Sequence, residues 1–203
     1  SEDYLRCAVG DMAKGHVYFG THTTPGRVLR VGVSQKSFIK GTKFLMPEPG
    51  TVETLSFYSH VASGNVRLAF YDTGTPPALL WESPSTVNTA AGAWLTVPVS
   101  DGTPSSLTLD AGSYWLAWQV DTLEAVPGYT AGAAGDGFYV PRAFGSFPAA
   151  LDATHTAVPT LSSEQWGLYL TYAADALRVT PASGFTATGY EGGPFTPDAK
   201  TYS

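Results

Sequence analysis

The chain has 203 residues, of which 22 are glycine, 15 are proline and 14% are charged, and its formal net charge is −6. This length suits one substantial domain, and abundant Gly and Pro, which supply the backbone angles of turns, are typical of an all-β protein. Nucleic acids and anionic membranes attract clustered Lys and Arg, so the negative charge argues against both partners. No apolar run reaches 18 residues, so we expect no membrane span.

Short strand-like runs separated by turn signals follow one another along the chain, after an N-terminal segment (1–27) that we expect to be an extension. Such a series predicts a two-sheet antiparallel β-sandwich, jelly-roll-like and with long loops. The expected strands are Val28–Val33, Lys36–Phe44, Gly50–His60, Val66–Asp72, Ala78–Trp81, Ser85–Thr89, Trp94–Val99, Leu107–Leu109, Tyr114–Val120, Gly137–Val140 and Trp166–Ala173.

Two segments depart from this pattern. Residues 122–163 are rich in Gly, Ala and Pro and carry several aromatic side chains, which we expect to pin loops onto the sandwich. After residue 175 the chain becomes rich in turns, so we place the end of the sandwich module (1–175) there. Residues 176–203 then form a linker and the start of a following module, or a tail that docks or assembles with a neighbouring copy.

The stretch Ser113–Val120, with the sequence SYWLAWQV, is the clearest predicted strand. Side chains alternate between the two faces of a strand, so Leu116 and Trp118 share one apolar face. Trp115 and Gln119 then lie on the opposite face, where a large aromatic side chain next to an amide is unusual. Whether Trp115 is covered or exposed therefore determines what this face can do.

The same alternation, applied to the other strands, divides their side chains into an inward apolar set and an outward set that mixes aromatic and polar residues. Aromatic rings stack on the C–H faces of pyranoses, and Arg and Gln side chains hydrogen-bond to hydroxyls, so the outward set is a candidate glycan site. Two alternatives remain open for it: cover by the chain's own loops, or contact with a neighbouring protein. The candidate ligand-binding residues are Trp115, Trp94, Tyr71, Tyr58, Tyr169, Arg67 and Gln119.

Five segments together resemble a β-sandwich module of large, secreted, multidomain bacterial and archaeal proteins: 44–52 (FLMPEPGTV), 55–60 (LSFYSH), 64–72 (GNVRLAFYD), 93–97 (AWLTV) and 109–118 (LDAGSYWLAW). The resemblance covers about residues 36–175 in order and spacing. The tail from 192 (GGPFTP) is similar to the start of an immunoglobulin-like, BACON-type module. The resemblance implies an extracellular or cell-surface setting and no catalytic residues. It is compatible with glycan binding and with a structural or adhesive role in a surface layer, adhesin or filament.

Motifs of enzymes and metal sites are largely missing from the sequence. It has no Gly-x-Ser-x-Gly, His-Glu-x-x-His or phosphate-binding glycine motif, so we expect no enzymatic activity. The single Cys7 predicts a buried apolar residue rather than a nucleophile, and His16 with His22 is a weak ligand pair. We expect no cofactor, although loop carboxylates could hold a structural Ca²⁺. Asx-turn capping explains the aspartates at strand ends without a ligand: Asp72, Asp101, Asp110 and Asp121.

Overall fold

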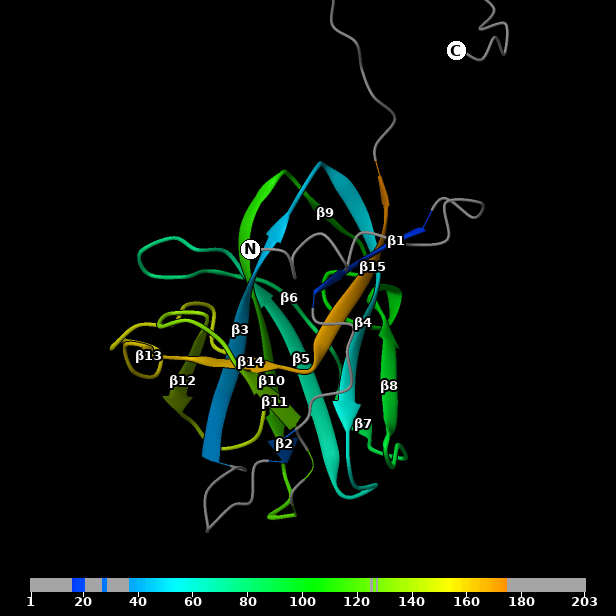
Figure 1. Ribbon diagram of the computed structural model, residues 1–203. Helices are drawn as coiled ribbons and strands as arrows, with labels where there is room; N and C mark the ends of the chain where they lie inside the picture. The colour runs from blue at the N-terminus through cyan, green and yellow to red at the C-terminus, as the bar shows by residue number, and fades with distance from the viewer. Residues whose placement is uncertain (1–15, 21–26, 29–36, 125, 127, 175–203) are drawn as a thin grey trace, which may run out of the picture.

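The computed structural model describes residues 16–20, 27–28, 37–124, 126 and 128–174, the first two ranges by their backbone alone. These residues form antiparallel strands stacked in two main layers (Figure 1). The predicted two-sheet antiparallel β-sandwich is therefore confirmed. The predicted tail (176–203), Cys7, His22 and most of the strand expected at Val28–Val33 lie outside the described residues.

One layer is a five-stranded sheet in the order β1-β15-β4-β8, with β9 also paired to β4. The long strand β4 lies at its centre because it pairs with β15 along one edge and with β8 and β9 along the other. A short 3₁₀ helix, Val99–Asp101, follows β8. The strands are β1 (His16–Gly20), β4 (Gly50–Ser59), β8 (Ala93–Pro98), β9 (Leu107–Leu109) and β15 (Leu168–Ala174).

The other layer is a seven-stranded sheet in the order β13-β12-β3-β10-β5-β6, with β7 also paired to β5. Its central strand, β10, is the predicted SYWLAWQV strand, extended at its start to Gly112. The strands are β3 (Phe38–Met46), β5 (Asn65–Tyr71), β6 (Leu79–Glu82), β7 (Thr86–Val87), β10 (Gly112–Val120), β12 (Gly137–Pro141) and β13 (Thr160–Ser162).

Apolar side chains from both sheets meet in one core between the layers. Phe57 of β4 packs against Trp118 of β10 with ring centroids 5.6 Å apart, and Leu68 and Leu116 are fully buried beside them. Burying each such side chain contributes about 1.5–3 kcal/mol, so this core is the main source of stability. The predicted inward residues all lie in the core or pack against it: Leu55, Phe57, Val66, Leu68, Phe70, Leu95, Val97, Val99, Leu116, Trp118, Trp166, Leu168, Leu170 and Tyr172.

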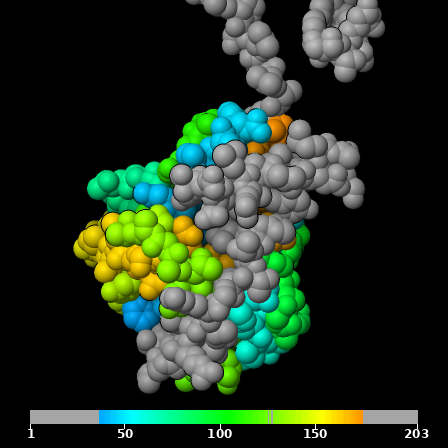
Figure 2. Space-filling view, in the orientation of Figure 1, coloured from blue at the N-terminus to red at the C-terminus, as the bar shows by residue number. Residues whose placement is uncertain are grey.

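Residues 122–163 contain more regular structure than their composition predicts. Within this segment the sequence analysis missed β11 (Gly128–Ala131), which joins β2 (Arg27–Val28) and β14 (Glu164–Trp166, just after the segment) in a small third sheet, and β13, which extends the large one. The segment packs against one side of the sandwich (Figure 2). Of the helices in the described part of the chain, none has the length and apolar character to cross a membrane.

Candidate functional site

Trp115 lies on the outer face of the seven-stranded sheet, between two cross-strand neighbours. In the antiparallel register it is opposite Lys43 of β3 on one side and Tyr71 of β5 on the other. The alternation predicted from the sequence therefore holds, because Trp115 faces away from the main core. Even so, only 7% of its surface is exposed.

The cover over this face is the segment that follows β12, residues 142–158. Its Phe147 and Leu151 join Trp115 and Tyr71 in a second apolar cluster, separate from the main core. Phe147 contacts Tyr71 edge to face, with centroids 6.3 Å apart. Trp115 and Tyr71 of the predicted outward set are therefore largely covered by a loop of the chain itself.

Hydrogen bonds to its backbone hold this cover in place. The buried Tyr71 hydroxyl donates to the Pro148 carbonyl at 2.9 Å, and burial raises the pKa of that phenol far above its ordinary value, so it remains a donor. The Leu79 N–H donates to the carbonyl of Ala149 at 2.9 Å, and the Leu151 N–H to that of Pro77 at 2.9 Å. The loop between β5 and β6 and the cover are thus joined as one unit.

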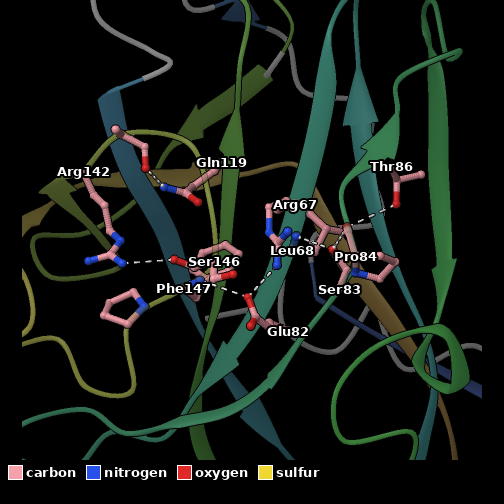
Figure 3. Close-up of polar contacts among 12 residues, drawn as sticks. Arg67, Leu68, Glu82, Ser83, Pro84, Thr86, Gln119, Arg142, Ser146 and Phe147 are labelled. Atoms are coloured by element: carbon pink, nitrogen blue, oxygen red, sulfur yellow. Dashed lines mark hydrogen bonds and ion pairs between the residues drawn. The ribbon is translucent and has the colours of Figure 1, made fainter.

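Arg67 and Gln119 are predicted to hydrogen-bond to the hydroxyls of a sugar, and in the structure they take part in the hydrogen bonds that hold the cover. The Arg67 guanidinium pairs with Glu82 of β6 at 2.8 Å, and the same carboxylate oxygen accepts the Phe147 N–H at 2.9 Å (Figure 3). The Gln119 side chain is fully buried and donates to the Ala143 carbonyl at 3.2 Å. Both side chains therefore help to hold the loop in place.

Beyond the edge of the cover, the outer face opens into a hollow of about 560 Å³. Trp115 and Phe138 form its aromatic part, and their rings meet edge to face with centroids 5.1 Å apart. The loop between β5 and β6 lines one side, and residues of the cover and β13 line the other. The described lining residues are Lys43, Thr73, Gly74, Thr75, Pro76, Pro77, Trp115, Phe138, Leu151, Asp152, Val158, Pro159 and Leu161.

Gly41 of β3 explains how Phe138 reaches this position. A Cβ atom at Gly41 would lie 2.3 Å from the Phe138 ring and 2.7 Å from the Leu116 carbonyl oxygen, so no larger residue fits without displacement. The ring of Phe138 therefore lies over the bare backbone of β3, where it contacts Trp115. The glycine thus shapes the aromatic part of the hollow.

The loop on the other side of the hollow is built on Asp72. Its Oδ1 accepts the backbone N–H groups of Gly74 and Ala78, at 3.0 and 2.7 Å. This is the Asx-turn role predicted for Asp72, and it holds Thr73 and Thr75 at the rim.

Two charged side chains line the hollow. The Lys43 Nζ lies 5.1 Å from the Trp115 ring centroid in a cation–π contact. Asp152 Oδ1 accepts hydrogen bonds from the His155 ring Nδ1 at 2.8 Å and from the backbone N–H groups of Thr154 and His155. The hydrogen bond from the His155 ring is the main cause that lowers the pKa of the Asp152 carboxyl.

The remaining predicted residues lie on the far side of the sandwich. Tyr58, Trp94 and Tyr169 belong to the five-stranded sheet and form a row of edge-to-face contacts, with centroids 5.2 Å apart for the first pair and 4.6 Å for the second. The single outward surface that the alternation suggested is therefore divided between the outer faces of two different sheets. Only Trp115 of the seven predicted residues lines the hollow.

Three residues of the hollow that the sequence analysis did not single out as ligand-binding are Lys43, Phe138 and Asp152.

Within the described residues there is no group of three or more His, Cys, Asp or Glu side chains placed to hold a metal ion. Comparison of the sequence with protein-family models and with curated proteins finds no match.

Proposed function

We propose that this chain is a non-catalytic, extracellular module that binds a glycan in the hollow beside Trp115. The observation that carries the proposal is the combination of aromatic and polar groups in one concave site. The exposed side chains of Val158 and Leu161, together with the small exposed part of Trp115, offer apolar surface for the C–H face of a pyranose, and Thr73 and Thr75 offer hydroxyls at the rim. A volume of about 560 Å³ falls in the range of small-molecule sites.

The same lining supports binding rather than hydrolysis. Glycosidases generally use two carboxyl groups on either side of the scissile bond. Among the described residues that line the hollow, Asp152 alone carries a carboxylate, and its Oδ1 is held by the turn to His155. We therefore expect a bound glycan to be released unchanged.

The proposal is tested by screening the protein against a glycan array and then measuring affinity for the best ligand by calorimetry. Trp115→Phe keeps an aromatic ring in the cluster but reduces its area, and we expect it to weaken binding by about 2–10-fold. Trp94→Phe is the matched control, because Trp94 lies on the other sheet, and its affinity should equal that of the wild type. Equal affinity of the Trp115 variant and the wild type would refute the site.

A structural or adhesive role is the second candidate, favoured by exposed apolar side chains around the same hollow. Val158 and Leu161 are 69% and 62% exposed, and Leu161 lies on β13, the edge strand of the large sheet. Exposed apolar groups at a sheet edge suit contact with another protein. If this role holds, light scattering will show concentration-dependent association that Leu161→Asp abolishes; a monomer at all concentrations contradicts it.

A further inference from the structure

Lys43 is the exposed cation of the hollow, and its surroundings bear on which glycan would bind. It projects from β3 next to Trp115, and the described residues offer its ammonium group no carboxylate within ion-pair distance. The backbone of Lys43 is fixed by a 2.7 Å hydrogen bond from its N–H to the Asp136 carbonyl. An ammonium group thus lies at the aromatic part of the hollow, and no described carboxylate pairs with it.

Asp152, the negative group of the hollow, does not match that charge, because its partner is His155. Its lowered pKa keeps it ionised at neutral pH. A ligand in the hollow thus meets a positive group beside the tryptophan and a negative group on the cover. An anionic substituent is attracted to the first and repelled by the second, which defines one orientation.

We propose that the hollow selects a glycan containing a hexuronic acid, whose carboxylate pairs with the Lys43 ammonium group while its pyranose ring lies in the hollow beside Trp115. This inference rests on the proposed function and names its substrate class. The rim hydroxyls of Thr73 and Thr75 then face the neutral hydroxyls of the sugar.

The net charge of the whole chain indicates how many acidic sugars the bound glycan contains. With a net charge of −6, the protein repels polyanions at long range, and of the described residues that line the hollow only Lys43 attracts an anion locally. At physiological salt this repulsion is screened beyond about 8 Å, whereas the contact at Lys43 is shorter. The favoured ligand is therefore one uronic acid among neutral sugars, rather than a continuous polyuronate.

The test compares two oligosaccharides that differ only at one carbon: a uronic-acid-containing oligosaccharide and its carboxyl-reduced, neutral counterpart. Calorimetry with the wild type should show about fivefold tighter binding of the acidic form, which is the upper end for an exposed ion pair. Lys43→Gln should bind both forms equally. Lys43→Arg keeps the charge and should keep the preference.

The outcomes separate the two proposals. If the wild type binds both oligosaccharides equally, or if Lys43→Gln still prefers the acidic form, the proposal of a uronic acid ligand is refuted. The proposal of glycan binding is not affected by either result. Binding of neither form, together with an array that shows no ligand, overturns both. A sulfated oligosaccharide, included as a further arm, overturns the choice of uronic acid if it binds more tightly and depends on Lys43.

Discussion

Tyr71 provides the sharpest test of how the cover is held over Trp115. Its ring is fully buried, and its hydroxyl donates to the Pro148 carbonyl at 2.9 Å. Tyr71→Phe removes the hydroxyl and preserves the shape of the ring, so the packing with Phe147 is unchanged. The substitution leaves a buried carbonyl without its donor, which costs about 1–3 kcal/mol.

Tyr114→Phe is the matched control for this substitution. The Tyr114 hydroxyl donates to the Asp110 carbonyl at 3.1 Å in an exposed position, where water can replace it. Urea unfolding followed by tryptophan fluorescence should show a loss of about 1–3 kcal/mol for Tyr71→Phe. The control should lose less than about 0.5 kcal/mol, as is usual for a surface substitution. Equal losses in the two variants would refute the conclusion that Tyr71 fastens the cover.

Three further substitutions probe the same surroundings. Gly41→Ala forces the Phe138 ring to move and should lower stability by about 1–3 kcal/mol, whereas Gly145→Ala, with open space around it, should have almost no effect in the same unfolding assay. Glu82→Ala removes an acceptor of two hydrogen bonds, so hydrogen exchange in the cover (residues 142–158) should accelerate; unchanged exchange contradicts this role. Burial lowers the pKa of His60 below its ordinary value of 6.5, and its buried Nε2 has no hydrogen-bond partner among the described residues, so protonation favours the unfolded chain. Unfolding free energy should therefore fall as the pH drops below 6.5, and His60→Gln should flatten this dependence.

The strands of the sandwich could be predicted because their side chains alternate strictly. Leu116 and Trp118 lie in the core and Trp115 on the other face, as a period of two requires. Alternation gives the phase of a strand but does not say which sheet the strand joins. Tyr58 and Trp115 share an outward phase and nevertheless lie on different sheets.

The cover and the hollow could not be predicted for a different physical reason. The cover is held largely through backbone groups, such as the carbonyls of Pro148 and Ala149, which leave no pattern in the sequence. The position of Lys43 beside Trp115 depends on the register of β3 against β10, which local sequence does not specify. The sequence therefore predicted that Trp115 lies on the outer face of its sheet, but it did not predict that Arg67 and Gln119 would hydrogen-bond to Glu82 and to the Ala143 carbonyl.

The central claim, that the hollow beside Trp115 is the binding site, is tested most directly by nuclear magnetic resonance of the tryptophan indole N–H groups. The chain has five tryptophans, and substitution of each by Phe assigns its signal. Titration with an oligosaccharide that binds should shift the Trp115 signal and leave that of Trp94, on the opposite sheet, unchanged. A shift of the Trp94 signal with no change at Trp115 would contradict the account.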